Sequence, residues 1–208
     1  MSNLKIGVLG IQGDIEENVL STEETLKHQN LRGTVESVRY YESIEEIDGL
    51  IIPGGESTVI GNLLSIQGKV FQTIEKRISE GMPVLGTCAG LIMLSKRAYD
   101  RIVGETKQKL FGALDVVIER NAFGRQHESF EADLDIPLLG IDPFKGIFIR
   151  APIINNIGES ITILTKLNDK IVGVKQNNII GTSFHPELSA DNRIHELFVK
   201  DILKFTKK

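Results

Sequence analysis

The first half of this sequence alternates short apolar runs with stretches of helical periodicity. Residues 4–11 form a nearly continuous apolar run, which is typical of a strand buried on both faces. From Asp14 onward the apolar residues recur on one helical face, and strand-like segments follow at residues 34–41 and 50–52. Strands that alternate with helices need crossover connections, so the pattern predicts a mainly parallel sheet.

A long helical stretch and a fourth strand complete this pattern. Residues 57–80 have helical periodicity, with a break expected near Gly68 and a C-cap at Gly81. Residues 83–86 are the fourth strand. Beyond them the texture changes to short strands joined by turn signals such as Asn168-Asp169 and Asn177-Asn178. These strand-like segments are residues 115–120, 129–134, 146–150, 161–167, 171–176 and 179–184.

The chain closes with an amphipathic helix, and nothing in the sequence suggests a linker or a repeat. The apolar residues that share a face of this helix are Ile194, Leu197, Phe198, Ile202 and Phe205. A length of 208 residues suits one well-packed unit. We therefore expect a single domain over residues 1–208, with an α/β fold on a central mixed, mainly parallel sheet.

Composition and charge exclude several classes of function. The formal net charge is −4 and both signs are interspersed, so we expect neither a nucleic-acid partner nor a membrane partner. The single cysteine excludes an internal disulfide, and no apolar run approaches the length of a membrane span. The N-terminal apolar run is interpreted as a strand rather than a signal peptide. A cytoplasmic location is the resulting expectation.

Cys88 is the candidate nucleophile. It lies in Gly86-Thr87-Cys88-Ala89-Gly90, between a predicted strand and an apolar helical run at residues 91–94. A sharp strand-to-helix turn lifts such a side chain above the sheet edge, and flanking glycines permit the close approach. The helix that follows favours the thiolate. A lone cysteine is more often a small buried apolar residue, and the glycine frame after a strand argues against that interpretation.

His185 and Glu187 are the candidate base and its orienting carboxylate. They end the last predicted strand in Ser183-Phe184-His185-Pro186-Glu187. Side chains two apart in an extended segment point to one side, and Pro186 disfavours helical backbone at His185. A cysteine nucleophile needs a base, and the base needs a partner that fixes its tautomer. We expect His28 and His195 to be helix residues without a catalytic role, and the sequence assigns no role to His127.

The segment Pro53-Gly54-Gly55-Glu56-Ser57 is the candidate oxyanion loop. Acyl transfer from an amide needs backbone N–H donors at the developing oxyanion, and the N–H groups of Gly55 and Ala89 are the candidates. A plain turn is the alternative. Nucleotide binding is rejected because the loop lacks the P-loop lysine and the early glycines have the wrong spacing for a dinucleotide fingerprint. No metal or other cofactor is expected.

The elbow, the glycine loop and the SFHPE segment, in this order, resemble the class I (triad) glutamine amidotransferases. The resemblance is strongest to the family of glutaminase subunits of pyridoxal 5′-phosphate synthases and covers essentially the whole chain. It is carried by five segments: residues 6–13 (IGVLGIQG), 53–58 (PGGEST), 119–126 (ERNAFGRQ), 148–152 (FIRAP) and 183–188 (SFHPEL). Residues 96–110 are the least distinctive part.

This resemblance implies a flavodoxin-like fold and the hydrolysis of L-glutamine to L-glutamate and ammonia. It also implies a hetero-oligomer with a TIM-barrel synthase subunit, which uses the ammonia to make pyridoxal 5′-phosphate (vitamin B6), and no cofactor on this chain. The family pattern implies that Gln12 lies near the oxyanion region. The residues that it assigns to glutamine binding are Gln12, Gly55, Glu56, Ser57, Arg120, Ile149 and Arg150.

The chemistry of glutamine agrees with this assignment. Its α-carboxylate needs a cation, and an arginine binds a carboxylate through two parallel hydrogen bonds. The alternative for Arg120 and Arg150 is a structural ion pair, which is common. The resemblance also implies weak activity without the partner. We expect residues 53–57 to be the element that moves, since their glycines permit a peptide flip.

Three other functions are compatible with parts of the sequence. The chain could be the glutaminase of another pathway, such as histidine synthesis, but residues 6–13 and 119–126 argue against this. A non-catalytic regulatory subunit would keep the fold, but the intact triad argues against it. A hydrolase of γ-glutamyl peptides would be separated from a glutaminase by substrate profiling.

Overall fold

A computed structural model describes residues 3–100, 102, 104–120, 122 and 129–207. In this described part of the chain no helix is long and apolar enough to cross a membrane. The helices are α1 (Ile15–His28), α2 (Tyr41–Glu46), α3 (Ser57–Ile66), α4 (Gly68–Ser79), α5 (Ala89–Leu94) and α6 (Arg193–Phe205), with short 3-10 helices η2 (Pro137–Leu139) and η3 (Pro186–Leu188).

The described strands form one large sheet and one hairpin. The large sheet has the order β2-β1-β3-β4-β13-β12-β10-β7-β5-β6, with β11 paired to β12 outside that path, and β8 pairs only with β9. The strands are β1 (Leu4–Leu9), β2 (Gly33–Val38), β3 (Gly49–Ile52), β4 (Val84–Thr87), β5 (Ser95–Asp100), β6 (Gly104–Glu105), β7 (Leu114–Arg120), β8 (Ser129–Leu134), β9 (Phe144–Ile149), β10 (Ile153–Ile157), β11 (Thr162–Leu167), β12 (Lys170–Gln176) and β13 (Ile179–Thr182).

The parallel half of the sheet determines where the functional segments meet. Strands β2, β1, β3, β4 and β13 run parallel to one another, and β13 is antiparallel to β12 on its other side. In β4 and β13, Thr87 lies opposite Thr182, and the N–H of Cys88 donates to the carbonyl of Thr182 at 2.8 Å. Because the carboxyl ends of parallel strands share one edge, the segments that follow β1, β3, β4 and β13 all emerge together.

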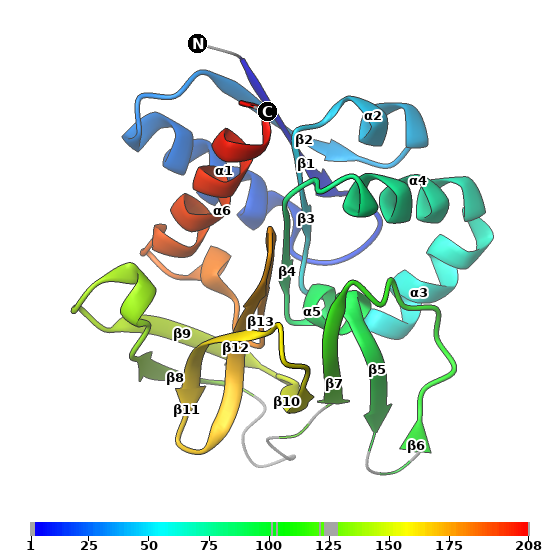
Figure 1. Ribbon diagram of the computed structural model, residues 1–208, viewed down its shortest axis with the longest axis vertical. Helices are drawn as coiled ribbons and strands as arrows, with labels where there is room; N and C mark the ends of the chain where they lie inside the picture. The colour runs from blue at the N-terminus through cyan, green and yellow to red at the C-terminus, as the bar shows by residue number, and fades with distance from the viewer. Residues whose placement is uncertain (1–2, 101, 103, 121, 123–128, 208) are drawn as a thin grey trace.

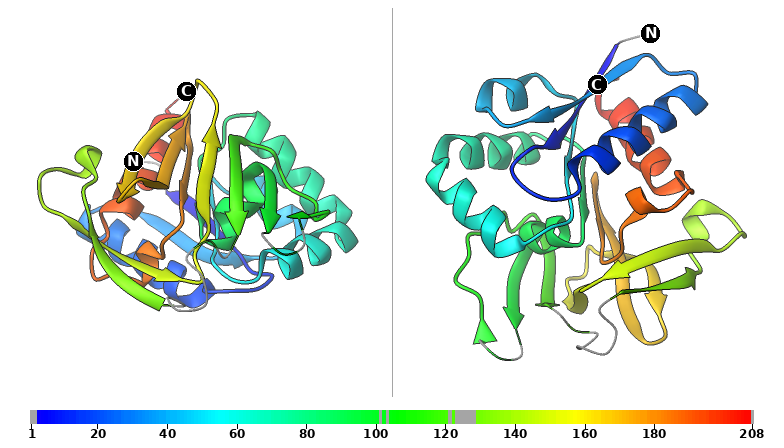
Figure 2. Two further views of the ribbon diagram at one scale, coloured as in Figure 1. Left: turned by 90° about the horizontal axis from the view of Figure 1, so that it is seen from below. Right: turned by 180° about the vertical axis from the view of Figure 1, so that it is seen from behind.

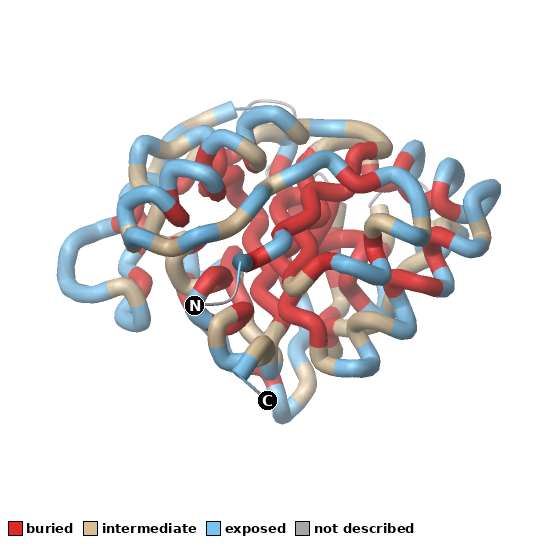
Figure 3. The backbone as a smooth tube through the Cα atoms, turned by 90° about the horizontal axis from the view of Figure 1, so that it is seen from above, coloured by how far each residue is buried: buried red, intermediate tan, exposed pale blue. Residues whose placement is uncertain are grey.

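Helices cover both faces of this sheet, as Figures 1 and 2 show. Helices α2, α3, α4 and α5 pack on one face through an apolar cluster that includes Ile44, Phe71 and Leu91. Helices α1 and α6 pack on the other face through a cluster that includes Leu26 and Phe198. Figure 3 shows the buried strands running between these exposed outer layers. This is the mixed α/β architecture that the sequence predicts.

The β8–β9 hairpin brings a distant part of the chain to the same sheet edge. Phe144 and Phe148 of β9 are fully buried and contact the ring of Phe184. The backbone N–H of His185 donates to the carbonyl of Ile147 at 2.8 Å. The end of β9 is therefore held beside the segment that follows β13.

Several elements differ from the sequence-based expectation. The break near Gly68 is confirmed, and so are the turns at Asn168 and Asn177, which both have φ +52°. Helix α2, in contrast, begins at Tyr41, where the sequence suggested the end of a strand. It is only six residues long and buries one apolar residue, Ile44, so it has no detectable periodicity.

Three strands were not expected from the sequence: β5, β10 and the two-residue β6. Strand β5 has only two buried positions and no alternation of buried and exposed residues. Strand β10 carries adjacent asparagines, and its register against β7 shifts between Ile154 and Asn156. Neither β5 nor β10 shows the period-2 pattern from which a strand is predicted. Pairing with β7, rather than a half-buried face, holds each of them in the sheet.

Candidate active site

Cys88 lies at the tip of a tight strand-to-helix turn. Strand β4 ends at Thr87 and helix α5 begins at Ala89, so a single residue makes the turn. Its backbone has φ 49° and ψ −99°, outside the regions that residues other than glycine favour. A Cβ atom on Gly90 would overlap the carbonyl of Ile52 on β3. The glycine after the cysteine is therefore required by close packing of the turn against the neighbouring strand.

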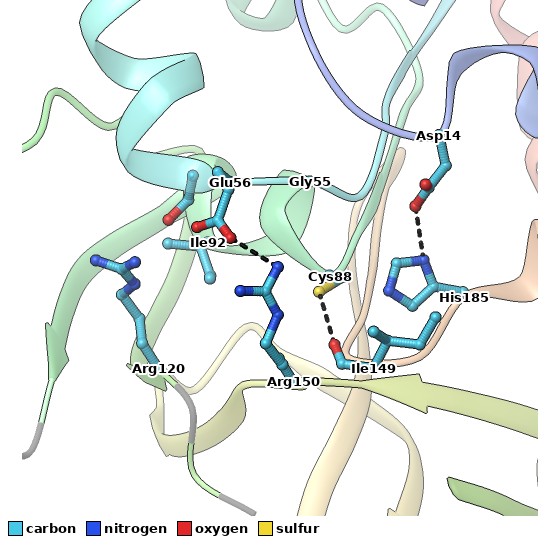
Figure 4. Close-up of a pocket in the computed structure, with 10 residues that line it drawn as sticks. Asp14, Gly55, Glu56, Cys88, Ile92, Arg120, Ile149, Arg150 and His185 are labelled. Carbon is cyan, nitrogen blue, oxygen red and sulfur yellow. Dashed lines mark hydrogen bonds and ion pairs between the residues drawn. The ribbon is translucent and has the colours of Figure 1, made fainter. Parts of the chain in front are cut away.

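Backbone strain within the described residues is concentrated at this site. Five residues other than glycine have positive φ, and three of them are asparagines in turns, where this conformation is tolerated. The other two are Cys88 and Arg150, with φ 49° and 44°. Such conformations cost about 1–3 kcal/mol each and persist where the surrounding structure imposes them. Both residues face the same pocket (Figure 4).

His185 and Glu187 form a buried hydrogen-bonded pair. Nδ1 of His185 lies 2.8 Å from Oε1 of Glu187, whose side chain is 0% exposed. The pairing agrees with the sequence prediction, but the predicted extended backbone is wrong. Pro186 begins the 3-10 helix η3, a role that suits its fixed φ, and only His185 keeps a non-helical conformation. The turn, rather than an extended segment, brings the carboxylate back to the imidazole.

A second carboxylate, which the sequence analysis did not identify, reaches the same ring nitrogen. Oδ2 of Asp14 lies 3.1 Å from Nδ1 of His185 (Figure 4). Burial by itself lowers the pKa of His185, but the carboxylates of Asp14 and Glu187 and the nearby thiol of Cys88 outweigh it and raise the pKa to about 12. The base is therefore an imidazolium at neutral pH in this arrangement.

The thiol of Cys88 lies at the floor of the pocket. Cys88 is 7% exposed, and its Sγ atom lies 3.8 Å from the carbonyl oxygen of Ile149. Among the described residues, Nε2 of His185 has no partner at hydrogen-bond distance. Contacts between catalytic groups often tighten only when substrate binds, so this geometry is compatible with a nucleophile and its base.

Residues 12–14 hold the candidate oxyanion loop through two hydrogen bonds. The side-chain oxygen of Gln12 accepts the backbone N–H of Glu56 at 2.8 Å. The N–H of Asp14 donates to the carbonyl of Gly54 at 3.2 Å. Gly55 has φ +148°, which a side chain would disfavour. Gln12 thus contacts the loop rather than lining the pocket.

The residues around Cys88 enclose a pocket of about 170 Å³. This is smaller than the roughly 300–1,000 Å³ of drug-sized sites and suits a metabolite of amino-acid size. The lining residues are Asp14, Gly55, Glu56, Ser57, Cys88, Ile92, Arg120, Ile149, Arg150 and His185. Across its mouth, Nη2 of Arg150 lies 2.7 Å from Oε1 of Glu56, with both side chains substantially exposed.

Most of the sequence-predicted site residues meet here. Gly55, Glu56, Ser57, Arg120, Ile149 and Arg150 line the pocket with Cys88 and His185. Gln12, Ala89 and Glu187 are not lining residues: Gln12 is hydrogen-bonded to Glu56, Glu187 to His185, and Ala89 follows Cys88 in the chain. Sequence reasoning missed Asp14 and Ile92. Ile92 is four residues after Cys88, one turn along α5, which was a usable signal. His127 and most of the segment at residues 119–126 lie outside the described residues.

Asp14, His185 and Glu187 are also the one group of described residues close enough to share a metal ion, with their ligand atoms within 4.8 Å of one another. Both carboxylates are directed at a single imidazole nitrogen, however, and the pair His185–Glu187 is almost completely buried. The arrangement fits orientation of a base better than coordination of a metal.

Comparisons with known proteins agree with this geometry. A model described as the SNO glutamine amidotransferase family matches residues 8–204. A relative from Nitrosopumilus maritimus, called pyridoxal 5′-phosphate synthase subunit PdxT, is 50% identical over 98% of this chain and 98% of its own length. A relative from Pyrococcus furiosus with the same name is 46% identical over 96% of this chain and 100% of its own length.

Solved structures give the same result for the fold. A crystal structure of a glutamine amidotransferase has a TM-score of 0.82 and 42% sequence identity, covering 95% of this chain and 98% of that one. A glutamine amidotransferase from Thermotoga maritima has a TM-score of 0.61 and 15% identity, covering 100% of this chain and 87% of that one. The second similarity concerns the fold alone.

Proposed function

This chain belongs to the SNO glutamine amidotransferase family, and from that premise we propose that it hydrolyses L-glutamine to L-glutamate and ammonia as the glutaminase subunit of a pyridoxal 5′-phosphate synthase. Near-full-length relatives that are called subunits of this synthase support the assignment. The observation that carries it is the strained turn that brings Cys88 into one pocket with His185, whose ring is hydrogen-bonded to Glu187.

In the first step the Cys88 thiolate attacks the side-chain amide carbon of glutamine. The amide oxygen becomes an oxyanion, which the backbone N–H groups of Gly55 and Ala89 stabilise. The His185 imidazolium then donates its Nε2 proton to the amide nitrogen, and the C–N bond breaks to release ammonia. Glu187 accepts the Nδ1 hydrogen throughout, which fixes the ring for this transfer. The product left on the enzyme is a γ-glutamyl thioester.

The second step returns the enzyme to its starting state. His185, now neutral, takes a proton from water, and the resulting hydroxide attacks the thioester carbon. Collapse of the second tetrahedral intermediate breaks the C–S bond, releases glutamate and restores the thiolate beside the imidazolium. The same two N–H groups stabilise both oxyanions.

Charged residues at the pocket mouth suit the other end of the substrate. Glutamine carries an α-carboxylate and an α-ammonium group. We assign the carboxylate to the guanidinium groups of Arg120 and Arg150 and the ammonium to Glu56, with Ser57 and Ile149 completing the lining. The ion pair between Arg150 and Glu56 supports this, since it shows that opposite charges already face each other there.

The partner is a synthase subunit that consumes the ammonia. We propose that this subunit is a TIM barrel and that the two form a hetero-oligomer, with residues 1–208 of this chain acting as one domain. A single cysteine that must stay reduced to work supports a cytoplasmic location. No cofactor is needed for the chemistry assigned to this chain.

The direct test is glutamate release from glutamine by the purified chain, with and without the synthase subunit from the same source. We expect slow release by the chain alone and an increase of at least tenfold with the partner. A synthase subunit of another pathway, such as histidine synthesis, is the matched control and should give no increase. An increase with that control instead would reassign the pathway.

Absence of glutamate release in both conditions, from folded protein, would contradict the glutaminase assignment. Labelling of Cys88 by an electrophilic glutamine analogue would then separate the remaining functions. Labelling together with hydrolysis of γ-glutamyl peptides would identify a peptide hydrolase, and no labelling would favour a non-catalytic subunit.

A further inference from the structure

Two carboxylates compete for one hydrogen in this site. Nδ1 of His185 carries a single N–H, yet both Glu187 and Asp14 lie within hydrogen-bond distance of it, at 2.8 and 3.1 Å. A cysteine–histidine mechanism requires one orienting carboxylate, and Glu187 supplies it. The carboxylate of Asp14 is therefore an additional charge that the mechanism described above does not use.

The position of Asp14 in the chain suggests a helix-capping role, but its side chain contacts His185 instead. It is the N-cap residue of α1, where an aspartate normally accepts a backbone N–H of the first helical turn. The Asp14 side chain makes no such hydrogen bond. Its carboxylate is turned instead toward His185, as Figure 4 shows. A residue type that commonly serves its own helix is directed here at the catalytic base.

Asp14 is also connected to the oxyanion loop. Its N–H donates to the carbonyl of Gly54, which precedes the proposed oxyanion donor Gly55. Gly13 and the carbonyl of Gly54 are packed so closely that a Cβ atom on Gly13 would overlap this carbonyl. A Cβ on Gly54 would approach Oδ2 of Asp14 to 2.7 Å and would also overlap the ring of His185. The loop, the base and Asp14 therefore form one packed unit.

The charged environment of His185 comes from three elements. Asp14 approaches from the loop after β1, Glu187 from η3, and the Cys88 thiol from the turn after β4. The Glu187 side chain is fully buried, whereas that of Asp14 is 35% exposed. Of the two acids, Asp14 is thus the one that solvent, substrate or a docked partner reaches most directly.

We propose that Asp14 is a positioning residue that shares the Nδ1 hydrogen of His185 with Glu187, stabilising the imidazolium opposite Cys88 and connecting the base to the oxyanion loop. Asp14 does not touch the reacting atoms; it acts through His185. Loss of its charge should weaken the imidazolium–thiolate pair, so that Cys88 ionises at higher pH. This inference rests on the proposed function.

The test is the rate of Cys88 alkylation by iodoacetamide as a function of pH, because only the thiolate reacts. The variant Asp14→Asn keeps the size and the helix-capping ability of the residue and removes its charge. We expect its alkylation profile to shift to higher pH by about one unit, which is a tenfold lower rate on the acid side. Glutamine turnover with the partner should show a lower kcat with an unchanged KM.

Glu17→Gln is the matched control, since Glu17 is an exposed acid in the first turn of the same helix. It removes the same charge from α1 and should leave both profiles unchanged. Should Asp14→Asn fail to fold, Asp14→Ser, which also caps helices, gives the same readouts. Thermal unfolding of each variant verifies the fold.

An alkylation profile of the folded variant that matches those of the parent chain and of Glu17→Gln would overturn this inference, even if glutamine is hydrolysed normally. Alkylation needs no glutamine, so it tests Asp14 independently of the reaction. A parent chain that never releases glutamate would contradict the proposed function while leaving the alkylation result to decide on Asp14.

Discussion

The guanidinium of Arg150 and the carboxylate of Glu56 meet 2.7 Å apart across the mouth of the pocket, although they lie 94 positions apart in the sequence. Arg150 has φ +44°, so the end of β9 is held in a strained conformation that directs this side chain over the site. Both groups carry charges that complement a zwitterionic amino acid. In the absence of substrate each neutralises the other.

We therefore expect Arg150→Gln to raise the KM for glutamine by roughly 10- to 100-fold, since a hydrogen bond to a charged group contributes about 1.5–3 kcal/mol. The free energy of unfolding should change by no more than about 1 kcal/mol, because exposed ion pairs contribute little. Steady-state kinetics and urea unfolding measure the two effects. Arg32→Gln, at an exposed position outside the pocket, is the control. An unchanged KM for glutamine in Arg150→Gln would refute the assignment of the α-carboxylate to Arg150.

Cys88→Ala should abolish glutamate release while leaving the fold intact. Alanine removes the nucleophile. Cys88 is 7% exposed, and loss of its single sulfur atom leaves only a small change in side-chain volume, which should cost little stability. The φ of 49° remains, so no strain is relieved. Release of glutamate at a measurable fraction of the parent rate, with the thermal transition unchanged, would show that the thiol is not the nucleophile.

Glu187→Gln should lower kcat by roughly 10- to 100-fold without abolishing turnover, less than the full value of about 10²–10⁴ for a general acid–base group. The base survives, and Asp14 still accepts its Nδ1 hydrogen. The buried amide keeps the shape of the side chain. Single-turnover measurement of thioester formation, with the partner present, gives the rate directly. A rate equal to that of the parent would remove Glu187 from the mechanism.

The sequence predicts those parts of the fold and site that depend on local pattern. The cysteine turn is recognisable because the chemistry needs particular residues at fixed spacing, and the parallel half of the sheet because continuous apolar runs mark its buried strands. The pairing of His185 with Glu187 was also predictable, but its geometry was not. An i, i+2 rule for extended chains gave the correct contact, whereas the 3-10 turn at Pro186 produces it.

Features that depend on tertiary contacts could not be predicted from the sequence. Asp14 looks like the start of a helix, and only the parallel packing of β1 beside β3 brings it under the Gly54 loop and against His185. Strand β10 lacks any alternation, and its pairing with β7 and β12 places it in the sheet. Local propensity contains no information on either contact.

Gly90→Ala should destabilise the protein by about 1–3 kcal/mol or more, the usual cost of overpacking. The added Cβ would overlap the carbonyl of Ile52, so either α5 or β3 must move, and Cys88 with it. Glutamate release should fall together with stability. Gly68→Ala, at the start of α4, is the matched control, since a Cβ there meets nothing within 4 Å. Equal urea midpoints for the two variants would contradict the packing argument.

Acid should destabilise the protein through His195, a buried helix residue away from the pocket. Burial lowers the pKa of His195 to about 4, and its ring nitrogens have no partner among the described residues. The unfolded chain binds this proton near the ordinary histidine pKa of about 6.5. Between these two values the unfolded state therefore holds more protons, and the free energy of unfolding must rise with pH.

The neutral ring thus contributes stability that is fully present above about pH 6.5 and is lost as pH falls toward 4, a loss on the order of 3 kcal/mol. His195→Leu, which conserves an apolar environment, should remove this loss. Urea unfolding at pH 5 and pH 8 measures it: the difference between the two pH values should be smaller in the variant than in the parent chain. An equal difference in both proteins would show that His195 does not cause the acid sensitivity.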